Sequence, residues 1–201
     1  MKQKFSFAIC VAALAIWSCN NSSDSGTGAD TTASTTATSG DTSASTQANT
    51  NTAAATTPLT KDDSSFVMEA AVGGMMEVEA GNLAQQNGMS QRVKDYGSMM
   101  VTDHSKANSE LASLASSHGL TVPSALPADE QKHLDAMKKL TGKNFDKHYI
   151  DMMVNDHKKD ISKFKMAAEK CDDSQLKNWA STTLPTLQKH MDSVQAIKKG
   201  M

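Results

Sequence analysis

The hydrophobic residues beyond about position 60 recur at the spacing of an α-helix. They follow one another at intervals of three, four or seven, as in the series Val93, Met100, Ala107, Leu111 and Leu114. That spacing places them on one face of a helix, and no convincing two-residue alternation typical of strands occurs. The pattern predicts an all-α domain over residues 61–201. Its expected helices span approximately residues 61–87, 90–118, 127–140, 143–170 and 174–199.

Residues typical of helix ends stand near these boundaries. Gly88 suits the C′ position of the first helix, and Gly119, followed by an apolar residue, suits a Schellman motif. Pro127 can open the short helix, whereas Pro185 lies inside the last helix and should kink it near Thr182. The N-cap candidates are Asp62, Asp63 and Ser64 for the first helix, Ser90 for the second, and Asp172, Asp173 and Ser174 for the last.

The long connection over residues 119–142 predicts the topology. A helix of about 14 residues covers roughly 21 Å, and the remaining residues add up to about 30 Å when extended. The connection can therefore travel the length of a long helix, so that helices 90–118 and 143–170 run parallel. The expected fold is a ferritin-like four-helix bundle whose crossover contains the short helix. A plain up-and-down bundle with a folded loop at one end is the alternative.

An internal repeat supports the crossover. Residues 96–104 and 149–157 both read Tyr-x-x-Met-Met-Val-x-Asp-His, and they lie 53 positions apart (149 minus 96). His104 lies 14 residues after the expected start of its helix, at residue 90, and His157 lies 14 after residue 143. Parallel helices would bring these two histidines to the same depth in the bundle.

Three long helices each carry one histidine on the apolar face. His104, His157 and His190 are all in register with the hydrophobic residues of their helices. The first helix offers Glu77 or Glu79, which are two positions apart and cannot both point inward. Apolar residues share a face with each of them, but the depth along the helix favours Glu77.

These residues form a candidate metal site of Glu77, His104, His157 and His190, one from each helix. Imidazole suits zinc, copper and iron. Asp103 and Asp156 could orient the ligands from outside. The second-choice ligands are Glu79, Met100 and Met153. The thioethers of these two methionines, with those of Met75, Met76, Met99, Met152 and Met191, would favour copper(I).

A metal-free interpretation stands beside this one. Histidines on an apolar face can be hydrogen-bonded core residues, and methionine fills gaps in cores. Di-iron bundles carry a Glu-x-x-His pair on two helices, but Val101 and Val154 stand where those glutamates would be. Oxidoreductase chemistry is therefore the least favoured function, and no other enzyme motif is evident. His118, His133 and His148 are expected at the surface.

The first 60 residues resemble an export signal and a tether. A basic start and an apolar run over residues 5–17, too short to span a bilayer, are typical of a secretory signal peptide. The run ends in Ile16-Trp17-Ser18-Cys19, which resembles a bacterial lipobox and implies cleavage after residue 18 and lipidation of Cys19. Residues 19–60 are rich in Ser, Thr and Ala, and we expect them to form a disordered tether.

The number of cysteines and the net charge limit the kinds of function to be expected. Once the signal is cleaved and Cys19 is lipidated, Cys171 is left without a disulfide partner. Reactivity or metal binding at this cysteine is a minor expectation. The formal net charge of −2 gives no support for binding nucleic acid. The expected partner is a membrane, reached through the lipid anchor, and no protein partner can be read from the sequence.

Four segments together resemble a known family. They are residues 73–84, residues 100–111, residues 153–157, and Thr183-Leu184-Pro185 with His190. Their order is similar to that of the bacterial envelope family called domain of unknown function 4142, over about residues 64–197. The resemblance implies a ferritin-like bundle that is exported and often lipidated, without an established activity or cofactor.

The sequence thus favours a binding protein over an enzyme. The expected function is an envelope lipoprotein, held in the outer membrane on its periplasmic or surface face, whose bundle binds a transition metal. Asn20, directly after the lipidated cysteine, is compatible with that membrane. The alternative is a metal-free interaction or envelope-stress module with a buried polar core.

Overall fold

Five helices make up the part of the chain that the computed structural model describes, residues 57–201. They are α1 (Lys61–Asn87), α2 (Gln91–Ser117), α3 (Ala128–Met137), α4 (Gly142–Lys170) and α5 (Ser174–Lys199). The prediction of an all-α domain is confirmed, and no strand occurs within residues 57–201. The short helix α3 ends three residues before the predicted position 140, and Pro127 is its N-cap rather than its first residue. The signal peptide, Cys19 and residues 20–56 of the tether lie outside the described residues.

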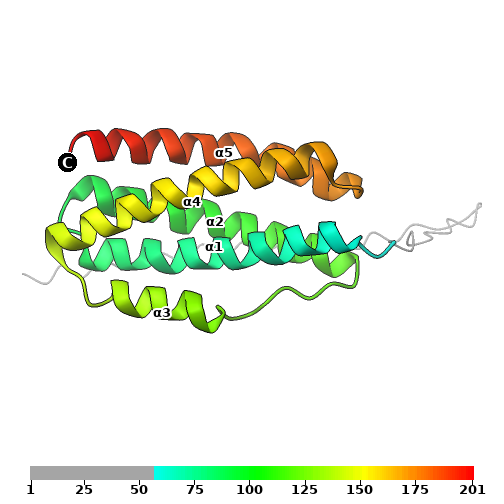
Figure 1. Cartoon of the computed structure of the whole chain (residues 1–201), viewed down its shortest axis with the longest axis horizontal. Helices are drawn as coiled ribbons and strands as arrows, with labels where there is room; N and C mark the ends of the chain where they lie inside the picture. Colours follow the sequence, from blue (N-terminus) through cyan, green and yellow to red (C-terminus); the bar gives the residue numbers. More distant parts are fainter. Residues whose placement is uncertain (1–56) are drawn as a thin grey trace, which may run out of the picture. The chain divides into compact units, whose positions relative to one another are not determined.

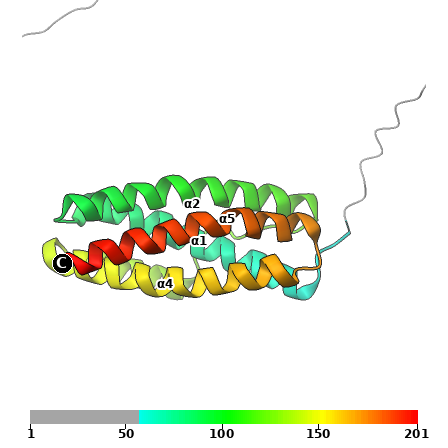
Figure 2. The ribbon, with the colours of Figure 1, turned by 90° about the horizontal axis from the view of Figure 1, so that it is seen from above.

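The four long helices form two antiparallel hairpins joined by a crossover. Helices α1 and α2 run in opposite directions, as do α4 and α5, whereas α2 and α4 run the same way (Figures 1 and 2). Helix α1 packs beside α4, and α2 packs beside α5. The parallel helices α2 and α4 therefore lie diagonally across the bundle. The crossover, residues 118–141 with α3, returns along the outside and contacts α1 and α4.

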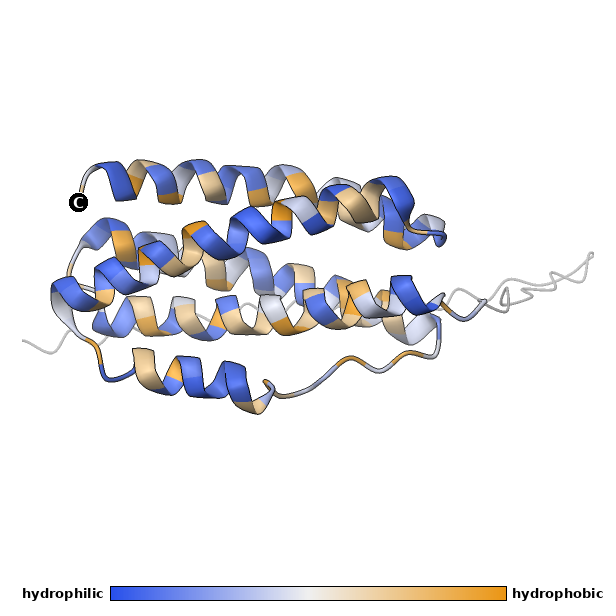
Figure 3. Ribbon diagram, viewed as in Figure 1, coloured by the Kyte–Doolittle hydropathy of each residue, from blue (hydrophilic) through white to orange (hydrophobic). Residues whose placement is uncertain are grey.

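The core is built from the apolar faces that the spacing predicts. Hydrophobic and hydrophilic residues alternate along the helices with the helical period (Figure 3). Tyr96 and Tyr149, the first residues of the two repeats, are both buried and pack edge to face with ring centroids 6.1 Å apart. No helix between residues 57 and 201 combines the length and apolar character needed to cross a membrane.

Helices α1 and α2 approach closely where two glycines face each other. A Cβ atom added at Gly97 would lie 2.7 Å from the carbonyl oxygen of Gly81 and 2.7 Å from the Cβ of Ala84. A Cβ added at Gly81 would lie 2.7 Å from the carbonyl oxygen of Gly97. All three contacts are shorter than van der Waals distance, and two of them are with backbone oxygen atoms. Glycine at these positions sets the spacing of the first hairpin.

Gly97→Ala is therefore expected to lower the free energy of unfolding by about 2 kcal/mol, because the backbone cannot move aside as a side chain could. Gly73→Ala is the matched control in α1, since a Cβ there meets no atom within 4 Å. The control should stabilise the fold by up to about 1 kcal/mol through helix propensity. Urea unfolding followed by circular dichroism measures both. Equal effects of the two substitutions would contradict the close approach.

Two buried aspartates hold the turns of the hairpins, and each comes from the opposite hairpin. Asp146 of α4 accepts hydrogen bonds from the backbone N–H groups of Met89 and Ser90, both at 2.8 Å. Asp63 of α1 accepts from the N–H groups of Asp172 and Asp173 at 3.3 and 3.0 Å. Each carboxylate satisfies donors at the turn that precedes a helix, where backbone N–H groups have no partner within the helix.

These contacts correct several predicted caps. Asp63 does not cap α1, because its buried carboxylate faces the α4–α5 turn. Asp62 and Ser64 do not cap it either. The N-cap is Thr60, whose hydroxyl accepts a hydrogen bond from the N–H of Asp63. Ser90 is the N-cap of α2 by position, but its side chain makes no capping bond. Asp173 caps α5 as predicted, in place of Asp172 and Ser174, and accepts from the N–H of Leu176 at 2.8 Å.

The two glycine predictions have opposite outcomes. Gly88 is not a left-handed C′ residue, because its φ of −62° and ψ of 143° are extended. Gly119 has a φ of 73°, and the N–H groups of Gly119 and Leu120 bond to the carbonyls of Ser116 and Ala115. That pattern is the predicted Schellman motif. The α4 helix starts at a second glycine with positive φ, Gly142.

His118 was expected at the surface, and this prediction is wrong. Its side chain is 4 % exposed, with Nδ1 2.8 Å from the carbonyl oxygen of Thr57 and Nε2 3.5 Å from Asp173. The ring extends beyond the end of α2 and is covered by residues from two other segments. Thr57 belongs to the last residues of the predicted tether, and Leu59 in the same segment packs against the core. His133 and His148 are exposed, as predicted.

Cys171 caps the end of α4 and is buried. Burial, together with the neighbouring Asp63 carboxylate, raises the pKa of its thiol to about 12. The thiol therefore stays protonated at neutral pH, which makes it a poor nucleophile and metal ligand.

Candidate metal centre

One carboxylate and three histidines meet in the middle of the bundle, one from each long helix. They are Glu77 of α1, His104 of α2, His157 of α4 and His190 of α5, and they are 3, 7, 0 and 0 % exposed. The three imidazole ring centroids form a nearly equilateral triangle with sides of 5.2, 5.2 and 5.7 Å. His104 and His157 thus face each other across the bundle, as their equal depth on parallel helices predicts.

Each histidine directs one ring nitrogen at a fixed acceptor. His104 Nδ1 lies 3.0 Å from Glu77 Oε2. His157 Nδ1 lies 3.1 Å from the carbonyl oxygen of Met153 and 3.3 Å from Glu77 Oε1. His190 Nε2 lies 2.9 Å from Asp103 Oδ2. Since a carbonyl or carboxylate oxygen only accepts, each of these three nitrogens carries a proton.

The other nitrogen of each ring is directed at the cluster itself. His157 Nε2 and His190 Nδ1 are 3.2 Å apart, and His104 Nε2 is buried without a hydrogen-bond partner among the described residues. When both rings are neutral, the nitrogens of His157 and His190 face each other lone pair to lone pair. Such a pair requires a cation between them, either a proton or a metal ion.

The electrostatics divide the cluster into a charged pair and two neutral rings. Burial lowers the pKa of His157, and burial together with the other two histidines lowers that of His190 to about 4. Burial opposes charge on Glu77 and His104 as well, but their mutual attraction lowers the pKa of Glu77 and raises that of His104. His157 and His190 are therefore held as neutral imidazoles, the form that binds metals.

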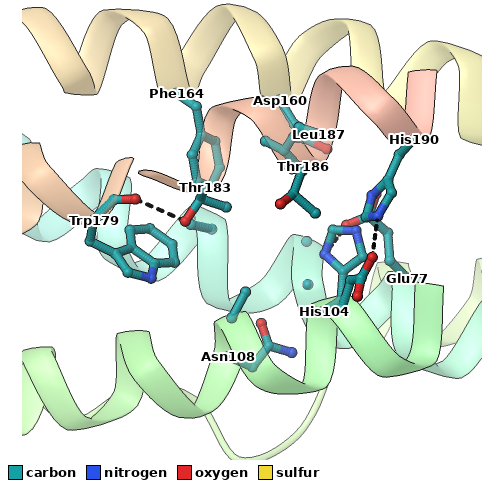
Figure 4. Close-up of a pocket in the computed structure, with 15 residues that line it drawn as sticks. Glu77, His104, Asn108, Asp160, Phe164, Trp179, Thr183, Thr186, Leu187 and His190 are labelled. Atoms are coloured by element: carbon teal, nitrogen blue, oxygen red, sulfur yellow. Dashed lines mark hydrogen bonds and ion pairs between the residues drawn. The ribbon is translucent and has the colours of Figure 1, made fainter. Parts of the chain in front are cut away.

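A small cavity of about 30 Å³ adjoins the cluster and extends along the bundle. His104, His190 and Glu77 lie at one end and Trp179 at the other, with Thr186 and Asn108 between them (Figure 4). Trp179 Nε1 is buried without a hydrogen-bond partner within residues 57–201. The cavity has room for a water molecule or a similarly small ligand.

Comparison with known proteins identifies the family. The sequence pattern that defines domain of unknown function 4142 (DUF4142) matches residues 48–197. This chain belongs to the DUF4142 family. No protein with a curated description matches this chain.

Two solved structures share the fold of the DUF4142 domain. A DUF305 fragment from Deinococcus radiodurans superposes with a TM-score of 0.63 at 7 % identity, covering 72 % of this chain and 99 % of that one. A DUF305 protein from Streptomyces coelicolor, described as a putative secreted protein, has a TM-score of 0.58 at 14 % identity, covering 68 % of this chain and 91 % of that one. At these identities the likeness shows the ferritin-like helical bundle alone.

None of the second-choice residues lines the cavity beside the cluster. Glu79 is exposed, because it is two positions from the buried Glu77 and therefore points to the other side of α1. Met100 and Met153 are fully buried in the core, but neither lines the cavity. The thioether argument for copper(I) therefore finds no support in this arrangement.

The two aspartates predicted to orient ligands differ in their positions. Asp103 does bond a ring nitrogen, that of His190 from the neighbouring helix α5. Asp156 instead pairs with Lys159 at 3.3 Å near the surface. One turn further along α4, Asp160 takes the place that Asp156 was expected to hold, since it lines the cavity together with Glu77 and His104.

Sequence reasoning missed Asp160 and Asn108. They lie three and four positions after His157 and His104, which is the spacing that places residues on one helix face. The lysines around Asp160 made its segment resemble a solvated face. A search for polar residues one turn from each inward histidine would have found both.

Asp160 makes the stability of the DUF4142 domain depend on pH. Burial and the Glu77 carboxylate raise its pKa from 3.8 to about 7. Because the folded pKa is above the unfolded one, stability is lost as pH rises from about 4 through 7. Asp160→Asn removes this loss, so the variant should exceed wild type by about 2 kcal/mol at pH 8, after allowance for solvent at the half-buried carboxylate, and by much less at pH 4.

Urea unfolding in the presence of a chelator at the two pH values checks the Asp160 prediction. Asp135→Asn is the control, because Asp135 is exposed and a hydrogen bond from Gln131 lowers its pKa. The control should not gain stability at pH 8. An Asp160→Asn effect of the same size at pH 4 and pH 8 would show that the carboxyl is not held protonated.

Proposed function

We propose that this bundle binds a divalent transition-metal ion through His104, His157 and His190. The observation that carries the proposal is the 3.2 Å contact between His157 Nε2 and His190 Nδ1, whose outer nitrogens both bond to acceptors. Two nitrogens of one tetrahedral zinc ion lie about 3.3 Å apart, given bonds of 2.0–2.1 Å. The two rings are thus already spaced as ligands of one ion.

The hydrogen bonds assign a role to each group. The proposed ligand atoms are His104 Nε2, His157 Nε2 and His190 Nδ1, the nitrogens that no oxygen acceptor occupies. Glu77 orients His104 through its Nδ1, and Asp103 orients His190. The Met153 carbonyl orients His157 through its Nδ1, with Glu77 3.3 Å from the same nitrogen. Carboxylates that bond the outer nitrogen of a ligating histidine fix its tautomer and raise its basicity. Glu77 acts here as an orienting group rather than as a fourth ligand.

The donor set supports a nitrogen-binding metal. Three imidazoles suit Zn²⁺, Cu²⁺ and Fe²⁺, with His104 releasing its Nε2 proton as the ion binds, and Cu²⁺ should bind most tightly by the Irving–Williams order. A buried group of three histidine nitrogens within 4.8 Å of one another favours the same interpretation. Three protein ligands would leave one coordination position of the ion free for a small ligand from the cavity that Asn108 and Thr186 line.

Thermal unfolding of the purified chain from residue 20 onward tests this function. Zn²⁺ and Cu²⁺ should each raise the midpoint temperature, and a chelator should reverse the rise, because a ligand that binds only the folded state stabilises it. Mg²⁺ serves as the control, since it prefers oxygen ligands. A chain that responds equally to Mg²⁺ and Zn²⁺, or to neither, would favour the metal-free polar core.

We further propose that the protein is exported and anchored in the outer membrane by lipid on Cys19. Ile16-Trp17-Ser18-Cys19 at the end of a short apolar run supports lipidation, and the polar residues that follow support a tether. The acyl chains would contribute about 0.8 kcal/mol for each buried methylene. The description of the Streptomyces coelicolor DUF305 protein as a putative secreted protein agrees with export.

Cys19→Ala tests the anchor. The variant should move from the membrane fraction to the soluble fraction of the producing cell, because no lipid can be attached. Cys171→Ala is the matched control and should leave the distribution unchanged, since that thiol is buried in the bundle. If Cys19→Ala remains in the membrane fraction, the lipid anchor is wrong.

A further inference from the structure

A surface groove reaches the metal centre from the side of the crossover. It has a volume of about 390 Å³ and lies among α1, α3 and α4. We call it the acidic groove. Its charged residues are Glu69, Glu77, Glu130, Asp156 and Asp160, with Lys159 and Lys163.

The acidic groove carries excess negative charge. Lys163 pairs with Glu69 at 2.6 Å, and Lys159 pairs with Asp156 at 3.3 Å. Glu130 of α3 forms no ion pair with any residue that the structure describes, so its charge is not offset; the excess does not depend on Asp160, whose pKa is raised to about 7. A cleft lined by one sign of charge concentrates ions of the opposite sign and speeds their association.

The groove and the cavity beside the histidines share three residues, namely Gly73, Glu77 and Asp160. Glu77 is buried, and its Oε1 accepts no hydrogen bond from the described residues, although His157 Nδ1 approaches it at 3.3 Å. A Cβ added at Gly73 would meet no atom within 4 Å. The glycine therefore leaves open space where the groove adjoins the cavity.

We propose that the acidic groove is the route by which a divalent cation reaches the three histidines. Glu130 attracts the hydrated ion at the rim, Asp160 and Glu77 receive it at the base, and Gly73 keeps the passage open. This inference rests on the proposed function, since it describes access to the same metal centre. It gives the crossover helix α3 a role, because α3 supplies the rim carboxylate.

The chain contains a reporter for the rate of uptake. It has two tryptophans, Trp17 and Trp179, and a chain that begins at residue 20 retains Trp179 alone. Trp179 lines the cavity next to the histidines. Cu²⁺ bound there should quench its fluorescence, so stopped-flow mixing with Cu²⁺ measures association, and mixing of the loaded protein with a chelator measures dissociation.

Two variants alter the route without touching the histidines. Glu130→Gln should slow association about threefold to tenfold at low salt, and the difference should shrink as salt increases. Gly73→Leu should slow association and dissociation alike, by about tenfold, and leave the equilibrium affinity near that of wild type. Glu79→Gln is the matched control, because it removes an exposed carboxylate of α1 outside the groove.

The outcomes separate this inference from the proposed function. If wild type binds Cu²⁺ and both Glu130→Gln and Gly73→Leu bind and release it at the rates of wild type and of Glu79→Gln, the route is overturned and the metal centre stands. Absence of Cu²⁺ binding by wild type in calorimetry would overturn both. If Gly73→Leu does not fold, Glu130→Gln still decides the result, since it lies at the surface and a wild-type association rate at low salt would overturn the route.

Discussion

His157→Ala is expected to weaken Zn²⁺ binding at least about a hundredfold. Structural zinc sites with four ligands bind with about 10–16 kcal/mol, so one ligand is worth roughly 3 kcal/mol, or about two powers of ten. His157 is also the ring that contacts both Glu77 and His190. Its loss removes one of the three proposed ligands. Isothermal calorimetry with the chain from residue 20 measures the affinity.

His133→Ala controls for the removal of a histidine from the same chain. His133 is exposed on α3, outside the cluster, so its replacement should leave the affinity within about twofold of wild type. Circular dichroism must show that His157→Ala keeps the helical content of wild type. A folded His157→Ala chain that binds Zn²⁺ as tightly as His133→Ala would remove His157 from the site.

Asp146→Ala is expected to cost about 3–5 kcal/mol of stability. The Asp146 carboxylate accepts two backbone hydrogen bonds at 2.8 Å and is 4 % exposed. Hydrogen bonds to charged groups contribute about 1.5–3 kcal/mol each, and the N–H groups of Met89 and Ser90 would lose their partner. The loss would loosen the α1–α2 turn and its contact with α4. Urea unfolding of wild type and variant measures the difference.

Asp63→Ala offers an internal comparison for this prediction. Asp63 holds the α4–α5 turn through longer bonds of 3.3 and 3.0 Å, so its replacement should cost less than that of Asp146. Because the two aspartates hold different hairpin turns, the double variant should lose the sum of the single effects. Asp135→Ala, at an exposed surface pair, should change stability by less than about 0.5 kcal/mol. A cost for Asp146→Ala as small as this would contradict the role of the buried carboxylate.

Helix positions and topology could be predicted because they depend on local period and chain length. The three-, four- and seven-residue spacing placed α1 at its observed bounds and the other long helices within one residue. The 24 residues of positions 119–142 are long enough to travel the bundle, which favoured parallel α2 and α4 over an up-and-down arrangement. The same reasoning brought His104 and His157 to equal depth, and the ring centroids lie 5.7 Å apart.

The partners of the polar side chains could not be predicted from period alone. Asp63 lies at the start of α1, where an aspartate is expected to act as a local N-cap, but the packing of the two hairpins directs its carboxylate to the α4–α5 turn. His118 has the position of a surface residue, but it is covered by Thr57 and Asp173, which are distant in sequence. Asp156 and Asp160 differ only by one helical turn. In each case a contact between distant segments decides the outcome.

The central claim is that His104 Nε2, His157 Nε2 and His190 Nδ1 bind one divalent ion. Its most direct test is a crystal structure of the chain grown with Zn²⁺, with anomalous scattering measured at the zinc edge. We predict one strong anomalous peak about 2.0–2.1 Å from each of the three nitrogens, with Glu77 still bonded to His104 Nδ1 and the Met153 carbonyl still bonded to His157 Nδ1. Anomalous peaks confined to the protein surface, with His157 and His190 still 3.2 Å apart and no metal at the cluster, would contradict it.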